Sequence, residues 1–222
     1  MRELIVEHSV AAEDTSAAHT AYNVLKERIV TATARPGSVI SDVTVAKELG
    51  MGRSPVREAL QRLARERLMT IVPRRGAFVS ELQVFELQQI FEVRVEMEGL
   101  CARLAAERAT LRDIAELRAI LAEEDAVSLK HDAKAIIPLD RHLHQAIIHT
   151  AQNTYLGDSL EPLRNISTRA WYLNFERYGH LSEMRSEHDA IVDAIARRDA
   201  VAAEDAMRRH VLSFRDKLRS LY

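Results

Sequence analysis

Residues 36–79 read PGSVISDVTVAKELGMGRSPVREALQRLARERLMTIVPRRGAFV, and this stretch decides the fold of the N-terminal part of the chain. Asp42 can cap a short helix, and the glycines of Gly50-Met51-Gly52 can form a tight turn after it. Ser54 suits the N-cap of a second helix and Pro55 suits its first position. Apolar residues then return at helical spacing, so the pattern predicts two helices joined by a turn.

A basic hairpin follows these helices. Two short apolar runs between Thr70 and Val79 flank the segment Pro73–Gly76, which contains two consecutive arginines. A helix, a turn, a second helix and a hairpin, in this order, predict a winged helix-turn-helix. We therefore expect a DNA-binding domain rather than a solvated arginine-rich surface, which would be the structural alternative.

The polar face of the second helix supplies the candidate base-reading residues. In helix-turn-helix proteins the N-terminal residues of this helix reach base edges in the major groove. An arginine there can donate two hydrogen bonds to guanine O6 and N7. The tip of the hairpin would lie near phosphates or a minor groove. The candidate DNA-binding residues from this reasoning are Arg53, Ser54, Arg57, Arg74, Arg75 and Gly76.

Charge is distributed unevenly along the chain. Residues 20–80 contain 11 Lys or Arg and 5 Asp or Glu, whereas residues 81–222 contain 19 and 24. The overall net charge of −2 therefore combines a basic N-terminal part with an acidic remainder. Only the basic part is suited to bind phosphates, and its affinity for DNA should fall as salt is added.

The length of 222 residues allows two domains, each with its own core. We expect a mobile N-terminal arm over residues 1–18, a winged helix-turn-helix over 19–80 and a helical domain over 81–222. The single cysteine, Cys101, lies in an apolar helical run and is expected to be a small buried residue. The sequence contains neither a transmembrane run nor a signal segment, which predicts a cytoplasmic protein without membrane contact.

Beyond residue 83 apolar residues recur at intervals of three and four, and there is almost no strand pattern. The fold class expected is therefore mainly α, with a winged helix-turn-helix followed by an all-helical bundle of about six helices. Along the first of these helices, Arg94 and Glu98 share the spacing of the apolar residues. The predicted helices are 83–109, 111–131, 133–151, 154–177, 181–198 and 200–221.

Four polar residues of this helical part are candidates for a metal site. Asp140 and His144 are four residues apart and therefore lie on one helix face. His188 and His210 are each 11 residues from Asp199, where two helices meet, so an antiparallel hairpin places both imidazoles at the same height. One carboxylate and three imidazoles suit a divalent transition metal, with zinc first and nickel, manganese or iron as alternatives. Histidines that are simply hydrogen-bonded in a core remain the alternative.

These segments together resemble a known family. The run from Pro36 to Val79 resembles the DNA-binding domain of the GntR family of bacterial transcriptional regulators. The later segments FEVRVEMEGLCARLAAERA, DRHLHQAI and EHDAIVDAIARRDAVAAEDAMRRHV resemble the FCD effector domain of its FadR subfamily. The resemblance implies a homodimer on a pseudo-palindromic double-stranded operator. It also implies a small carboxylate effector bound beside a metal that is held by Asp140, His144, His188 and His210.

The resemblance suggests further site residues and some departures. Thr44 stands where a DNA contact is expected, although family members often have a longer side chain there. Gly52 replaces a common serine before the first recognition arginine, and Arg67 replaces a common glycine. For the effector, Arg94 is a candidate carboxylate clamp, with an internal salt bridge to Glu98 as the alternative role. Further candidates for the effector site are Arg169 and Tyr172.

Two other functions share some of these features. A metal-sensing repressor would use the same architecture with the ion itself as effector. A metal-dependent hydrolase would need an acid or base beside the metal, and no spacing identifies one. Glu187 is next to His188 but faces about 100° away from it on a helix. The sequence therefore favours a regulator that is not an enzyme.

Overall fold

The computed structural model describes residues 14–129, 135–175 and 182–220. These residues belong to two compact units, Met1–Glu81 and Leu82–Tyr222. Within the described residues, no helix is long and apolar enough to cross a membrane.

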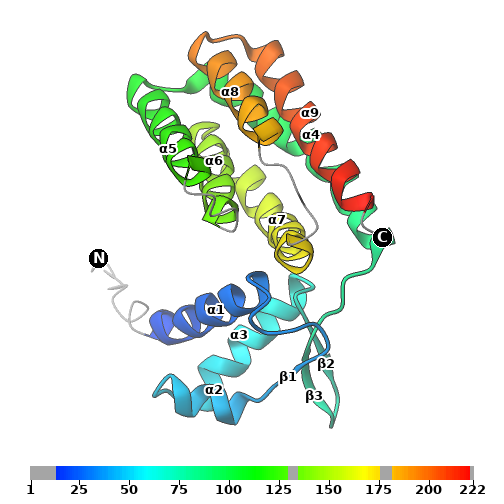
Figure 1. Ribbon diagram of the computed structural model, residues 1–222. Coiled ribbons are helices and arrows are strands. Elements are labelled where there is room, and N and C mark those ends of the chain that lie inside the picture. Colours follow the sequence, from blue (N-terminus) through cyan, green and yellow to red (C-terminus); the bar gives the residue numbers. More distant parts are fainter. Residues whose placement is uncertain (1–13, 130–134, 176–181, 221–222) are drawn as a thin grey trace, which may run out of the picture. The chain divides into compact units, whose positions relative to one another are not determined.

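The N-terminal unit is a winged helix-turn-helix that is preceded in the sequence by one further helix (Figure 1). The helix-turn-helix consists of α2, Asp42–Glu48, and α3, Arg53–Arg65. The wing consists of β2, Met69–Val72, and β3, Gly76–Val79. A two-residue strand β1, Val39–Ile40, pairs antiparallel with β3, which gives the strand order β1-β3-β2. Neither β1 nor the preceding helix is among the elements that the sequence predicted.

The additional helix is α1, Asp14–Val30, which packs on α3. Its buried residues Tyr22, Leu25 and Ile29 repeat at helical spacing and contribute to the core of this unit. The N-terminal arm predicted for residues 1–18 is therefore helical from Asp14 onward, and its first 13 residues lie outside the described part of the chain.

Both helix starts differ by a residue or two from the prediction. Ser41, not Asp42, is the N-cap of α2, and its hydroxyl accepts a hydrogen bond from the backbone N–H of Thr44. Helix α3 starts at Arg53 with Gly52 as its N-cap, so Ser54 lies inside the helix instead of capping it. Gly52 has no side chain to cap the helix, as the missing serine implies.

The turn after α3 depends on an unusual backbone conformation. Arg67 has φ 60°, in the left-handed region where glycine is common at the end of a helix. The N–H groups of Arg67 and Leu68 donate to Ala64 and Leu63, respectively, which closes the end of α3. The turn therefore forms without the glycine.

The C-terminal unit contains six helices within the described residues, as the sequence predicted (Figure 1). They are α4 Val84–Arg108, α5 Leu111–Leu129, α6 Ile136–Thr150, α7 Thr154–Asn174, α8 Ser182–Ala196 and α9 Ala200–Arg219. The parts of the predicted helices at residues 130–134, 176–181 and 221 lie outside the described residues.

Helix α4 contacts α6, α7, α8 and α9 and is therefore central to this unit. Gly99 allows a close approach to α9, because a Cβ atom there would lie 2.9 Å from Cγ of Arg208. The buried face of α4 also contains Arg94, Glu98 and Cys101. The two charged residues point toward the polar cluster described below, whereas Cys101 packs among apolar side chains.

Candidate functional site

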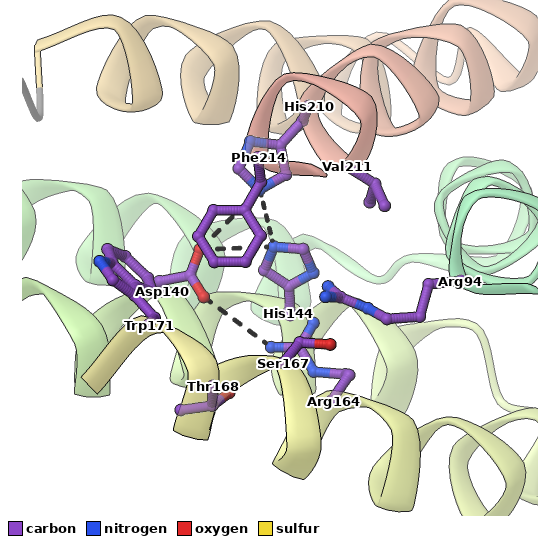
Figure 2. A pocket seen from close by; sticks show the side chains of 10 residues that line it. All are labelled: Arg94, Asp140, His144, Arg164, Ser167, Thr168, Trp171, His210, Val211 and Phe214. Atoms are coloured by element: carbon purple, nitrogen blue, oxygen red, sulfur yellow. Dashed lines mark hydrogen bonds and ion pairs between the residues drawn. The ribbon is translucent and has the colours of Figure 1, made fainter. Parts of the chain in front are cut away.

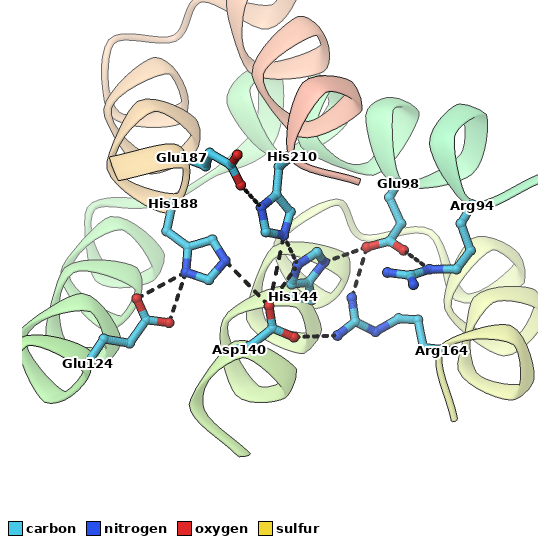
Figure 3. A network of polar contacts seen from close by, with 9 residues as sticks. All are labelled: Arg94, Glu98, Glu124, Asp140, His144, Arg164, Glu187, His188 and His210. Carbon is cyan, nitrogen blue, oxygen red and sulfur yellow. Dashed lines mark hydrogen bonds and ion pairs between the residues drawn. The ribbon is translucent and has the colours of Figure 1, made fainter. Parts of the chain in front are cut away.

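The four candidate metal ligands converge in the C-terminal unit (Figure 3). Asp140 and His144 lie on α6, His188 on α8 and His210 on α9. One atom from each residue can be chosen so that all four lie within 4.8 Å of one another. The Asp140 Oδ1 atom is 3.6, 3.4 and 3.8 Å from Nε2 of His144, His188 and His210, respectively.

Two local features produce this convergence. The spacing of Asp140 and His144 puts them on adjacent turns of one face of α6. Asp199 ends the α8–α9 connection by capping α9, since its side chain accepts a hydrogen bond of 3.0 Å from the N–H of Ala202. The imidazole rings of His188 and His210 then lie side by side, with their centroids 4.7 Å apart.

Each histidine contacts a carboxylate through its other ring nitrogen. Nδ1 of His144 contacts Glu98, Nδ1 of His188 lies 2.9 Å from Glu124, and Nδ1 of His210 lies 2.9 Å from Glu187. A carboxylate at Nδ1 fixes the ring and leaves Nε2 as the atom able to bind a metal.

Only one of these three glutamates, Glu98, had been placed on an inward helix face from the sequence. Glu187 faces away from His188, as expected, but the sequence did not indicate its contact with His210. Glu124 is 64 residues from its histidine, and no local pattern identifies the pair.

The donor set fits a divalent transition metal. Nε2 of His188 is buried and has no hydrogen-bond partner among the described residues. It nevertheless lies 3.4 Å from Asp140 Oδ1, and Nε2 of His144 and His210 are 3.0 Å apart. Donors about 2.0–2.2 Å from a shared zinc ion are separated by roughly 3–3.5 Å. The spacing is therefore close to that of one coordination sphere.

The buried charges favour a cation at the centre of the cluster. Burial lowers the pKa of His144 to about 3 and also lowers that of His210. Burial opposes the charge of His188 too, but the nearby carboxylates of Asp140 and Glu124 raise its pKa to about 9. The lowered pKa values keep His144 and His210 neutral, which is the form of imidazole that binds a metal, and the carboxylates around the three rings stabilise the positive charge of an ion.

A small cavity adjoins the cluster (Figure 2). Its volume is about 10 Å³, room for about one water-sized group. Two arginines, two hydroxyls and several apolar groups surround it, and the two guanidinium groups make its lining suitable for contact with an anion. The lining residues are Arg94, Asp140, His144, Arg164, Ser167, Thr168, Trp171, His210, Val211 and Phe214.

Arg94 forms a salt bridge and also lines the cavity. It is buried, and its Nε donates a 2.6 Å hydrogen bond to Oε1 of Glu98, which is the internal salt bridge. Its side chain also lines the cavity, as a carboxylate clamp requires. The salt bridge holds the side chain in place and therefore does not exclude the clamp.

Helix α7 contributes an arginine that the sequence did not single out. Arg164 is buried, lines the cavity and donates a 2.8 Å hydrogen bond from Nη1 to Oε2 of Glu98. It is also 4.0 Å from Asp140. Glu98 therefore joins both cavity arginines to the metal cluster. The cavity residues of α7 are spaced as one helix face: Arg164, Ser167, Thr168 and Trp171.

Arg169 and Tyr172, the other two candidates for the effector site, are not among the residues that line this cavity. Each follows a cavity residue by one position and is turned about 100° from it, and neither lines the cavity. Arg169 is buried elsewhere along α7. Tyr172 packs against the apolar cluster of Ile136, Ile137, Trp171 and Met184.

The candidate DNA-binding residues are all in the N-terminal unit and all exposed. Arg53, Ser54 and Arg57 lie in the first turns of α3, and Thr44 lies on α2. Arg74 and Arg75 form the tip of the wing between β2 and β3, where Gly76 begins β3 with φ 113°. The structure thus leaves these side chains accessible to DNA.

Comparisons with known proteins agree with this architecture. Residues 17–79 match the bacterial regulatory proteins of the gntR family, and residues 89–213 match the FCD domain. The Nta operon transcriptional regulator of Aminobacter aminovorans is 35% identical over 155 residues, 70% of each chain. The HTH-type transcriptional repressor RspR of Escherichia coli is 26% identical over 200 residues, 90% of this chain and 88% of RspR.

Solved structures are similar across almost the whole chain. The E. coli McbR/YncC structure has a TM-score of 0.84 and 24% identity, and the match covers 96% of this chain and all of that one. A GntR regulator from Rhodococcus has a TM-score of 0.77 and 21% identity, with 93% and 99% covered. At this level of identity the likeness shows the fold.

Proposed function

The chain belongs to the GntR family of bacterial regulatory proteins and carries an FCD domain, and we propose that it is a regulator whose hold on DNA responds to a small carboxylate bound beside a metal ion. Members of this family are transcriptional regulators that bind DNA, not enzymes. The observation that carries the proposal is the cluster of Asp140 and three histidines next to a cavity with two arginines.

DNA is bound by the N-terminal unit. The side chains of Arg53 and Arg57 are 53% and 61% exposed and lie on one face of α3. Arg74 and Arg75 at the wing tip contact phosphates or a minor groove. Two chains bind a pseudo-palindromic operator as a homodimer, with one recognition helix for each half-site.

The metal is held by Asp140, His144, His188 and His210, and zinc, nickel, manganese and iron all accept this donor set. When bound, it supplies positive charge and open positions for an oxygen ligand of the effector. Arg94 and Arg164 bind the effector carboxylate through their guanidinium groups. The aromatic groups of Trp171 and Phe214 restrict its size.

Helix α4 connects the effector site with the DNA-binding unit along the chain. Arg94 and Glu98 are on this helix, which starts at Val84, shortly after the last wing strand ends at Val79. An effector that contacts Arg94 binds more tightly to the protein when α4 is in one placement than when it is in another. The effector can change DNA affinity only by as much as its own affinity differs between these placements of α4. DNA binding then changes effector affinity by the same factor.

A metal-sensing regulator is the second candidate, because the cluster alone would respond to an ion. Titration of operator binding with metal at constant carboxylate, and then with carboxylate at constant metal, distinguishes the two. An organic-acid regulator responds in the second titration, whereas a metal sensor responds only in the first.

The central test uses a duplex enriched by the wild-type protein from a random-sequence library. Arg57→Ala should weaken binding to it by about 1–3 kcal/mol without changing the melting temperature.

A thermal-shift screen with acetate, glycolate and succinate, with and without chelator, should show a metal-dependent stabilisation. Arg164→Gln should abolish that shift. Unchanged DNA binding by the first variant, or equal shifts with and without metal, would contradict the proposal. A monomer at micromolar concentration in sedimentation would contradict the homodimer.

A further inference from the structure

An acidic residue lies between the two arginines that we assign to base reading. Arg57 Nε donates a 2.6 Å hydrogen bond to Asp42 Oδ2. Arg53 donates to the same carboxylate from Nη2, at 3.0 Å, and from Nε, at 3.3 Å. Asp42 is the first residue of α2, so one carboxylate joins both helices of the helix-turn-helix at the surface that faces DNA in this fold.

The pattern of hydrogen bonds determines which donors remain. Because Arg57 uses Nε for Asp42, the two terminal nitrogens at the end of its guanidinium are left for a ligand. Two parallel donors match O6 and N7 of guanine. A carboxylate on Nε also limits rotation about the last side-chain bonds, so less conformational entropy is lost when the arginine binds.

Exposure and charge agree with this geometry. The side chains of Arg53 and Arg57 are 53% and 61% exposed, whereas that of Asp42 is 19% exposed. The carboxylate is therefore partly covered by its arginines, whose far ends stay accessible. The hydrogen bond from Arg57, together with that from Arg53, lowers the pKa of Asp42, so the carboxylate remains charged at neutral pH.

We propose that Asp42 is a positioning residue for base reading: it orients Arg57, with Arg53 beside it, toward guanine and so sets the specificity of DNA binding rather than its strength. This inference rests on the assignment of α3 as the recognition helix. Asp42 itself touches no base. Its effect is exerted through the arginines.

Other roles of Asp42 predict different changes in DNA affinity when the carboxylate is removed. If Asp42 only competed with DNA for the two arginines, its removal would strengthen binding to every sequence. If it only contributed negative charge near phosphates, its removal would strengthen specific and non-specific binding equally. A positioning role instead predicts lower specificity together with unchanged or stronger non-specific binding.

The test compares Asp42→Asn with Glu58→Gln, which removes the same charge from an exposed position next to Arg57. Each guanine of the library-selected duplex is replaced in turn by 7-deazaguanine, which lacks the N7 acceptor. Affinities are measured for the selected duplex, for its substituted forms and for a mixed-sequence duplex. The melting temperature and helix content of each variant are measured in parallel.

For the wild type, 7-deazaguanine at the base read by Arg57 should weaken binding about tenfold. Asp42→Asn should reduce this penalty to about threefold or less and should lower the ratio of selected to mixed-sequence affinity about tenfold. Asp42→Glu, which restores a carboxylate, should recover part of that ratio. Glu58→Gln should keep the wild-type penalty.

Three outcomes would overturn the inference: a wild-type penalty in Asp42→Asn, tighter binding of that variant to all duplexes, or the same change in Glu58→Gln. If Asp42→Asn loses helix content, the decision passes to Asp42→Glu. A ratio below the wild-type value without a shift in melting temperature supports positioning, whereas tighter binding of Asp42→Glu to all duplexes overturns it. Failure of the recognition-helix assignment is a separate result, in which Arg57→Ala binds the selected duplex normally.

Discussion

Replacement of Glu98 by glutamine should destabilise the C-terminal unit strongly, even without metal. The Glu98 side chain is 1% exposed, and its two oxygens accept hydrogen bonds from Arg94 at 2.6 Å and Arg164 at 2.8 Å. Both arginines are also buried. Glutamine has nearly the same volume, but it is neutral, and its amide NH2 end donates hydrogen bonds and cannot accept one from a guanidinium group. Two buried guanidinium groups then share one weaker acceptor.

The magnitude follows from that loss. Removing one partner of a buried ion pair typically costs about 3–5 kcal/mol, and because glutamine keeps one acceptor we expect about 3 kcal/mol. With a urea dependence of about 2 kcal/mol per molar, the unfolding midpoint should fall by about 1.5 M. The control is Glu96→Gln on the same helix, whose side chain is 64% exposed and paired with Arg208. An exposed pair contributes about 0–1 kcal/mol, so the control should shift little.

The assay is urea unfolding in the presence of chelator, followed by tryptophan fluorescence. Trp171 is the only tryptophan of the chain and is 2% exposed in the C-terminal unit, so it reports on that unit alone. A second measurement is metal titration, in which loss of the Nδ1 partner of His144 should weaken binding about 10–100-fold. Equal midpoints for the two variants would refute the reasoning that Glu98 is required by the buried arginines.

Three further predictions concern other parts of the molecule. His188→Ala should lose most bound metal in elemental analysis, whereas His142→Ala, at an exposed position on α6, should keep it, and full occupancy in the first variant would exclude the proposed coordination. Arg67→Gly should stabilise α3 by about 1 kcal/mol in hydrogen exchange, because φ 60° is costly for a residue with a Cβ atom; faster exchange would contradict this. Burial raises the pKa of the Cys101 thiol to about 12, so Ellman's reagent at pH 8 should label it only after unfolding, and rapid labelling of the folded protein would show that the thiol is accessible.

The helices of the C-terminal unit were predictable because their apolar residues repeat at three and four positions, and their ends differ from the prediction by only a few residues. The metal-ligand geometry was predictable for a related reason. The equal distances of His188 and His210 from Asp199 fix their relative height once the two helices are antiparallel. Whether these atoms bind a metal stays a prediction.

Other features depend on contacts between distant segments, which local patterns do not encode. The Nδ1 partners of the histidines come from three different helices, so neither Glu124 nor Glu187 could be paired with its histidine in advance. Helix α7 is a different case, because every residue from Arg164 to Trp171 is buried. A segment buried on all sides has no polar face to show its orientation, so the sequence did not determine which residues of α7 line the cavity.

In the N-terminal unit, the differences between the predicted and the observed helices have simple causes. Serine and aspartate are both good N-caps, and Ser41 stands one residue before Asp42. The capping hydroxyl leaves the aspartate free to bind the arginines of α3. Helix α1 was missed because its small and mixed N-terminal residues suggested an arm, although Tyr22, Leu25 and Ile29 carry the helical spacing.

The short strand β1 has a consequence for how the N-terminal unit assembles. Val39 pairs with Phe78, and Ile40 pairs with Ala77, so the sheet is complete only when the chain on both sides of the two intervening helices has come together. Closure of such a long loop costs entropy before any pairing is gained. The wing is therefore not an autonomous hairpin, and its arginines should acquire their native arrangement only in the same cooperative step that folds α2 and α3. In a hairpin transplanted without β1, strand β3 would lose one of its two neighbouring strands, and the hairpin would lose much of its rigidity.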